Sequence, residues 1–236
     1  MKMVKFLVIG LALIVFILFC EPGNTAKGDE PKNMLLNPSF ESDKEKWLLY
    51  VEAGDATFEV VKDKDAPEGK KVAEVNIINP ADMRVELDSS LSFLFTLEER
   101  ETYTCSFWMK SENKRAIASY INHRAPPWTP YSDKPWFQID NEWKEYFYTF
   151  AMNNPSDSEC GLVLQLTANF GWGEAGPLRS IKGYIWVDNV KLYLGKYRPN
   201  TGQRQTVEPR GKLTTRWGII KAMNTKQLSE TEKGRI

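Results

Sequence analysis

The stretch RAPPWTPYSDKPWF, residues 124–137, holds large aromatic rings in a segment that cannot be helical. Four prolines accompany Trp128, Tyr131 and Trp136 there, and each proline fixes its own φ and lacks a backbone N–H. Rings in such a segment either close one end of a hydrophobic core or form a stacking surface for the apolar face of a ligand. In the second case the prolines would fix the ring positions in advance, which lowers the ordering cost of binding.

Residues that could carry catalysis are scarce. The chain has one histidine, His123, which argues against histidine-based metal or acid–base chemistry. Carboxylates are plentiful, but they lie in polar runs such as residues 98–101 and not as a pair that could flank a substrate. The stretch GWGEAG, residues 171–176, matches a dinucleotide-binding pattern, but Pro177 follows and no helix begins there. We interpret it as a loop, and the sequence predicts a protein that is not an enzyme.

Short apolar segments separated by turn residues make up most of the chain. Many alternate with period two: Tyr103, Cys105 and Phe107 share one face, while Thr104 and Ser106 share the other. This alternation is typical of antiparallel strands with one buried face. About nine such segments over roughly 160 residues predict an all-β fold, a jelly-roll β-sandwich of two antiparallel sheets that is galactose-binding-like. The expected strands are residues 34–42, 57–61, 70–78, 83–91, 101–111, 116–123, 142–152, 161–170 and 183–194.

The two ends of the chain differ in composition from this domain. Residues 1–20 combine an early positive charge with an apolar run that ends at Cys20, as in an export signal. A lipid on Cys20, ordinary cleavage and an uncleaved anchor all remain open. Residues 21–32 are a polar linker, residues 33–196 the β-sandwich, and residues 197–236 a basic, mostly flexible tail with room for a short helix. We expect an exported protein, secreted or anchored at the bacterial cell envelope, that meets the membrane only through its N-terminal segment or the lipid.

The charge balance bears on the expected partners, and the cysteines bear on whether the domain holds a disulfide. Lys+Arg and Asp+Glu both number 31, so the formal net charge of +0 gives no reason to expect nucleic acid as a partner. Cys105 and Cys160 both have core-facing parity in their expected strands. Export would permit a disulfide between them, and the alternative is two buried thiols that pack as small hydrophobic side chains.

Four different short sequence motifs follow one another along the domain. They are NMLLNPSFE at residues 33–41 followed by Trp47, TYTCSFWMK at 102–110, EWKEY at 142–146 running to Phe150, and VDNVKL at 187–192. In these motifs the chain resembles bacterial carbohydrate-binding modules of the CenC-like type, families 4, 9 and 22. The resemblance implies a jelly-roll sandwich that often carries a structural Ca²⁺ where its first and last strands meet. Glu41 and Asp188 match the positions that supply carboxylates to this ion, which takes about 6–8 oxygen ligands.

The resemblance also implies a carbohydrate ligand. A sugar has apolar C–H faces and a rim of hydroxyls, so aromatic rings and hydrogen-bonding side chains bind it together. The residues expected to contact it are the rings of Trp128, Tyr131, Trp136 and Trp172 and the polar groups of Arg84, His123, Arg124, Gln165 and Asn169. By contrast, Trp47, Trp143 and Trp186 match family positions that pack the core.

We therefore expect an exported, non-catalytic, monomeric module that binds poly- or oligosaccharide by aromatic stacking and hydroxyl contacts, with a structural calcium ion. Two alternatives stay open. A structural or protein-interaction sandwich at the cell surface would bury the loop tryptophans and present a bland outer sheet face. The other alternative is an accessory domain of a glycoside hydrolase system or a weak hydrolase. A hydrolase would need two carboxylates about 5–10 Å apart across a cleft.

Overall fold

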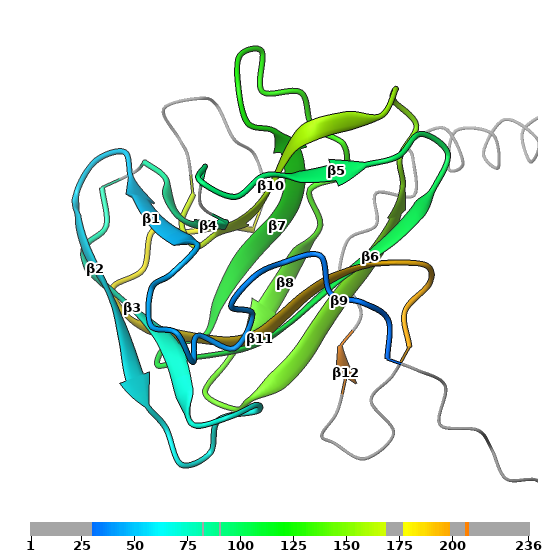
Figure 1. The fold of residues 1–236 in the computed structure, drawn as a ribbon. Helices are drawn as coiled ribbons and strands as arrows, with labels where there is room; N and C mark the ends of the chain where they lie inside the picture. The colour runs from blue at the N-terminus through cyan, green and yellow to red at the C-terminus, as the bar shows by residue number, and fades with distance from the viewer. Residues whose placement is uncertain (1–29, 82, 90, 169–176, 199–205, 208–236) are drawn as a thin grey trace, which may run out of the picture. The chain divides into compact units, whose positions relative to one another are not determined.

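The computed structural model describes residues 30–81, 83–89, 91–168, 177–198 and 206–207. Within these ranges the regular structure is entirely β, and the strands form two six-stranded sheets. The chain divides into the units Met1–Glu30 and Pro31–Ile236, and every strand belongs to the second. The predicted β-sandwich is therefore confirmed, whereas the export segment and most of the linker lie outside the described residues (Figure 1).

The first sheet, sheet A, is antiparallel throughout. Its strand order is β1-β4-β10-β7-β8, and β5 pairs with β10 beside that path. The strands are β1 (Trp47–Val51), β4 (Val85–Ser89), β5 (Phe95–Leu97), β7 (Arg115–His123), β8 (Trp136–Ile139) and β10 (Asp157–Gln165). Segments far apart in sequence, such as β4 and β10, thus become direct neighbours.

The second sheet, sheet B, has the order β12-β9-β6-β11-β3-β2. Its strands are β2 (Asp55–Lys62), β3 (Lys71–Asn79), β6 (Thr102–Ser111), β9 (Lys144–Ala151), β11 (Gly183–Leu194) and β12 (Thr206–Val207). All pairs are antiparallel except the short pairing of β12 with β9.

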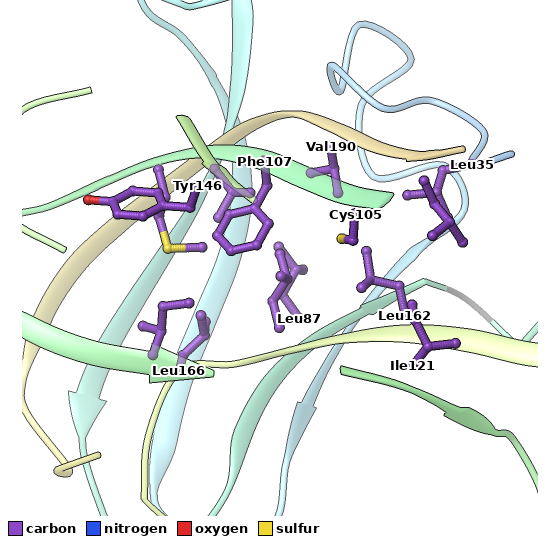
Figure 2. Packing of buried hydrophobic residues seen from close by; sticks show 14 of the residues in the cluster. Leu35, Leu87, Cys105, Phe107, Ile121, Tyr146, Leu162, Leu166 and Val190 are labelled. Atoms are coloured by element: carbon purple, nitrogen blue, oxygen red, sulfur yellow. The ribbon is translucent and has the colours of Figure 1, made fainter. Parts of the chain in front are cut away.

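The two sheets pack through the apolar side chains that alternate along their strands. Figure 2 shows Phe107 and Cys105 of sheet B directed toward Leu87 and Leu162 of sheet A. The rings of Phe107 and Phe137 meet edge to face across this core, with centroids 5.4 Å apart. Their geometry is one that aromatic pairs prefer.

Both cysteines of the core are free thiols. Cys105 lies on β6 in sheet B and Cys160 on β10 in sheet A, and both are buried. Of the two alternatives, the structure therefore supports the one in which each cysteine packs as a small apolar side chain.

One predicted strand is wrong. Residues 34–42 form bends and turns instead of a strand. Asn37 and Phe40 have positive φ values of 49° and 57°, which are incompatible with extended backbone. The Met34 N–H still donates to Leu192 O (2.7 Å), so the segment docks on β11 without extending the sheet. Strands β1, β5, β8 and β12 were not among the predicted segments.

The tryptophans assigned to the core divide between two places. Trp47 packs in the main core, as expected. Trp143 packs instead with Trp108 and Val72 in a separate apolar cluster, and Trp186 lies half-buried against it. Trp186 faces outward from sheet B, stacked on Tyr184 with ring centroids 5.7 Å apart.

The start of the predicted tail belongs to the folded unit. Tyr197 stacks on Phe147 of β9, with ring centroids 3.6 Å apart and planes 9° from parallel. Its hydroxyl donates to Glu145 Oε2 at 3.0 Å. The part of the tail that has room for a short helix falls outside the described residues.

Candidate functional site

The side chains that point away from the core on sheet A bring charged groups together. In register across the sheet, Tyr120 pairs with Val163 and Val163 with Asp88, while Gln165 pairs with Glu86. We call this surface the polar face; its side chains are Tyr50, Arg84, Glu86, Asp88, Tyr120, Asn122, Arg124, Trp136 and Gln165.

Small residues form the floor of the polar face. Ala118, Val163 and Gly161 lie in its central strands, β7 and β10. A Cβ atom added to Gly161 would lie 2.4 Å from Cδ of Arg124 and 2.6 Å from its Cγ. Glycine at this position leaves room for the arginine side chain to lie against the sheet and reach Asp88.

Asp88 and Arg124 form a buried ion pair on this floor. The Arg124 Nη2 group donates to Asp88 Oδ2 at 2.7 Å, and the two side chains are 10% and 3% exposed. Burial, together with the negative charge of Glu86, raises the pKa of Asp88 to about 7 against the opposing effect of Arg124.

A second charged network lies beside this pair. The Tyr120 hydroxyl donates to Glu86 Oε1 at 2.9 Å, and Arg84 Nη1 lies 3.8 Å from the same oxygen. Arg84 Nε also donates to Glu52 Oε2 at 3.0 Å. Burial raises the pKa of Glu86, and the nearby Arg84 charge opposes this effect. The polar face therefore holds its charged groups in fixed positions before any ligand arrives.

The loop after β7 is anchored at its base. His123 Nδ1 lies 2.9 Å from Asp157 Oδ2, and the Tyr131 hydroxyl donates to the same oxygen at 2.8 Å. Burial alone would raise the pKa of Asp157, but hydrogen bonds from the Glu159 backbone, His123 and Tyr131 lower it to about 2. His123 and Tyr131, both predicted ligand contacts, thus fix the loop to β10.

The tryptophans of this loop have different surroundings. Trp128 is 52% exposed. Its backbone N–H donates to Ala125 O at 2.7 Å in a turn at the loop tip. Figure 1 shows this connection, in green, projecting past the strand ends. Trp136 begins β8 and lies half-buried on the polar face, packed with Ala118 and Leu178. In residues 124–137, therefore, the Trp128 ring is exposed, whereas the Tyr131 and Trp136 rings pack partly against buried residues.

Each of the two tyrosine rings of the polar face has a cationic side chain over it. The Arg84 guanidinium lies over the Tyr50 ring, 5.4 Å from its centroid. Lys134 Nζ lies over the Tyr120 ring at 5.1 Å. These contacts occupy one face of each tyrosine, which leaves the tryptophans as the main apolar surfaces.

Of the other predicted contacts, Arg84, Arg124 and Gln165 lie on the polar face. Gln165 is fully buried, however, and its Nε2 donates to Thr167 O at 2.8 Å, so its amide takes part in internal packing. Trp172 and Asn169 lie outside the described residues.

Asp88, Glu86 and Tyr120 of the polar face were not among the predicted ligand contacts. The alternation of Arg84 and Glu86 with Val85 and Leu87 already indicated which side of β4 faces outward. It did not indicate that β10 would bring Tyr120 and Arg124 opposite these carboxylates.

Glu41 and Asp188, the predicted calcium ligands, are joined by one turn. Glu41 Oε1 accepts hydrogen bonds from the Lys70 and Lys71 N–H groups at 2.6 and 2.8 Å. Asp188 Oδ2 accepts one from Glu68 N–H at 2.8 Å. Burial is the main cause that raises the pKa of Asp188 to about 7, and the negative charges of Glu68 and Glu41 add to it.

The donor set at this turn fits a hard cation. Asn189 Oδ1 is buried and has no hydrogen-bond partner in the described part of the chain, and Asp188 beside it is fully buried. Ca²⁺ is bound by mixtures of carboxylate, amide and carbonyl oxygens. Over the described ranges, no group of three or more His, Cys, Asp or Glu side chains is close enough to hold a metal, so carbonyl oxygens would have to complete the shell.

Among residues 30–81, 83–89, 91–168, 177–198 and 206–207, no helix has the length and apolarity to cross a membrane. The apolar run of residues 1–20 lies outside these ranges.

Comparison with known proteins gave one family and several structures. The family model described as "Carbohydrate binding domain" matches residues 32–170. The solved CBM22-1 xylan-binding domain from Paenibacillus barcinonensis Xyn10C is 15% identical with a TM-score of 0.50, covering 71% of this chain and 97% of that chain. A solved CBM4 structure is 16% identical with a TM-score of 0.49, covering 68% and 99%.

A larger solved protein has the same fold in one part. The arabinose-bound MgGH51 α-L-arabinofuranosidase is 11% identical with a TM-score of 0.54, over 72% of this chain but only 28% of that chain. Among curated proteins, no match was found.

Proposed function

This chain belongs to the carbohydrate-binding domain family, and on that premise we propose that the polar face of sheet A binds an oligosaccharide or polysaccharide. The observation that carries the proposal is a set of prepositioned charged groups on a floor of small residues. Asp88 and Arg124 are held over Gly161, with Glu86 and Tyr120 beside them.

The physical match to a sugar is twofold. Carboxylates and guanidinium groups form charge-assisted hydrogen bonds with hydroxyls, and these are stronger than neutral ones. Because ion pairs already hold the groups in place, little side-chain ordering is needed on binding. Trp136 on the face and Trp128 at the loop tip supply apolar surface for the C–H side of a ring.

A binding role fits the polar face better than hydrolysis. Glu86 and Asp88 are the buried carboxylates of this face, and they lie two residues apart on the same side of β4. Glycoside hydrolysis uses two carboxylates that flank the scissile bond from different sides. Neighbours on one strand do not provide that arrangement.

A structural sandwich without a sugar site is the less favoured alternative. It requires a bland outer face and buried loop tryptophans. The polar face carries paired buried charges, and Trp128 is 52% exposed. Both observations favour a ligand at this end of the sheet.

The first test is retention of the full chain on insoluble polysaccharides. Xylan is one arm because the similar Paenibacillus domain is described as xylan-binding; cellulose and mixed-linkage β-glucan are the others. We expect retention on at least one, and a loss of about ten-fold or more in affinity for Trp136→Ala. Trp186→Ala is the matched control, because Trp186 is a half-buried tryptophan on the outer face of sheet B. Failure of the folded chain to bind any of these glycans would refute the proposal.

Two further features of the protein are part of this proposal. The first is a structural Ca²⁺ held by Glu41, Asp188 and the Asn189 amide oxygen, which the donor set at this turn supports. The ion would neutralise the Glu41 and Asp188 carboxylates, which both accept hydrogen bonds from the turn at residues 68–71. A rise in melting temperature of the full chain with Ca²⁺ over EDTA, absent in Asp188→Asn, is the expected result.

The second feature is export, with the protein secreted or held at the cell envelope. The support is the charged start and apolar run of residues 1–20, which end at Cys20. Incorporation of labelled palmitate that Cys20→Ala abolishes would indicate a lipid anchor. Release of the chain into the medium without label would indicate ordinary cleavage.

A further inference from the structure

The ion pair of the polar face is made with only one hydrogen bond. A guanidinium and a carboxylate can form two parallel hydrogen bonds. Here Arg124 Nη2 bonds to Asp88 Oδ2 at 2.7 Å, and Nη1 lies 3.4 Å from Asn122 Oδ1. Asp88 Oδ1 and Arg124 Nε are both buried and have no hydrogen-bond partner among the residues that the structure describes.

These two atoms have opposite hydrogen-bonding needs. Asp88 Oδ1 is an acceptor, and Arg124 Nε–H is a donor. Buried polar atoms without partners are costly and rare in folded proteins, most of all on charged groups. A ligand that satisfied both would have to offer one donor and one acceptor, and neighbouring groups would have to move to admit it, since both atoms are closed to solvent.

We propose that Asp88 and Arg124 recognise a vicinal diol of the bound sugar. One hydroxyl donates to Asp88 Oδ1, and its neighbour on the ring accepts from Arg124 Nε–H. This inference rests on the proposed carbohydrate function and adds the chemical group that the polar face selects.

The surroundings of Asp88 support a donor that comes from the ligand. Glu86, Arg84 and Arg124 are the charged groups that act on it. Burial and the Glu86 charge raise the pKa of Asp88 to about 7 in spite of both arginines. The protein's own groups therefore leave the ionised carboxylate incompletely stabilised, and a hydroxyl donor would complete it.

Selectivity follows from the same geometry. Gly161 gives Arg124 room to lie against the sheet, because a Cβ there would stand 2.4 Å from its Cδ. A sugar with either hydroxyl methylated would leave a buried charged atom without a partner. Sites that hydrogen-bond a hydroxyl reject analogues that lack it far better than apolar pockets reject a wrong shape.

The experiment follows the Arg124 Nε–H resonance of the ¹⁵N-labelled full chain by NMR. The probes are xylohexaose, cellohexaose and mixed-linkage β-glucan hexasaccharide, each also in its O-methylated form. The resonance is identified by its absence in Arg124→Lys. We expect the free sugar that binds to shift this resonance, and its O-methylated form to bind at least about ten-fold more weakly.

Protein variants provide a second readout. Asp88→Asn and Arg124→Lys should each weaken binding by about ten- to a hundred-fold. The matched controls are Glu59→Gln and Arg100→Lys, whose side chains are 64% and 89% exposed in surface ion pairs, and both should bind normally. If Asp88→Asn does not fold, the O-methylated sugars still decide, because they need no variant.

Each outcome has a defined meaning. Binding without a shift of the Arg124 resonance, and with full affinity for the O-methylated sugar, would overturn this inference and leave the carbohydrate function intact. Absence of binding by every probe would overturn the proposed function and the inference together.

Discussion

Gly161→Ala tests whether one missing side chain organises the polar face. The new Cβ would meet Cδ and Cγ of Arg124 at 2.4 and 2.6 Å, closer than real contacts allow. The arginine must therefore leave the floor and give up its 2.7 Å hydrogen bond to Asp88. The backbone of β10 is unchanged, so the substitution acts mainly on the buried ion pair.

The size of the effect depends on pH. Burial holds the pKa of Asp88 at about 7 even with Arg124 beside it. At pH 6 the carboxyl is mostly protonated in both proteins, and the variant loses about 1 kcal/mol of unfolding free energy with the hydrogen bond. Above pH 7 the native protein ionises Asp88 against Arg124, whereas in the variant the pKa of Asp88 rises further because Arg124 no longer opposes the effect of burial. The loss then grows with pH, by up to about 1.4 kcal/mol per pH unit, until Asp88 of the variant also ionises.

Urea denaturation of both proteins at pH 6 and pH 9 measures this difference. A double-mutant cycle with Arg124→Ala identifies the cause, because Gly161→Ala should cost almost nothing once the arginine side chain is gone. The reasoning would be refuted by an equal cost of Gly161→Ala in both backgrounds, or by a cost that does not change with pH.

Other predictions concern parts of the protein away from the polar face. Burial raises the pKa of Asp188 from 3.8 to about 7. Without Ca²⁺, the unfolding free energy should therefore fall between pH 4 and pH 7. We expect this fall to be larger in the native chain than in Asp188→Asn by on the order of 4 kcal/mol. Equal pH slopes in urea denaturation would contradict this. Tyr197→Ala should lose about 1–2 kcal/mol, since it removes the stacking on Phe147; hydrogen exchange in β9 should quicken, and unchanged exchange would argue against a docked tail. Dithiothreitol should leave the melting temperature unchanged because Cys105 and Cys160 are free; a fall would indicate a disulfide.

The strands were the most predictable part of the protein. Alternation such as Tyr103, Cys105 and Phe107 against Thr104 and Ser106 identifies β6 because successive side chains of a strand point to opposite faces. For residues 34–42 the apolar composition led to the wrong prediction of a strand. Asn37 and Phe40 take positive φ there, and hydrogen bonds from the Asn37 side chain to Asp43 O and Glu45 O hold the turns. Apolar composition alone does not distinguish a strand from such a docked turn.

The site residues were predictable only in part. Arg124 and Trp136, predicted from their place in a proline-rich loop, lie on the polar face, as does Arg84, which directly precedes β4. Asp88 lies in the predicted strand 83–91, two residues after Glu86, and was not singled out. Its role depends on burial and on a neighbour 36 residues away, neither of which parity can supply.

The sequence by itself determined the all-β class, the core-facing side of most strands and the family, because these depend on local periodicity and on the order of short motifs. The tertiary structure alone decided that β10 lies between β4 and β7, and that Gly161 makes room for Arg124 to reach Asp88. Pairing between distant strands is set by the whole core at once, and no single segment encodes it. The chemistry of the polar face arises from that pairing.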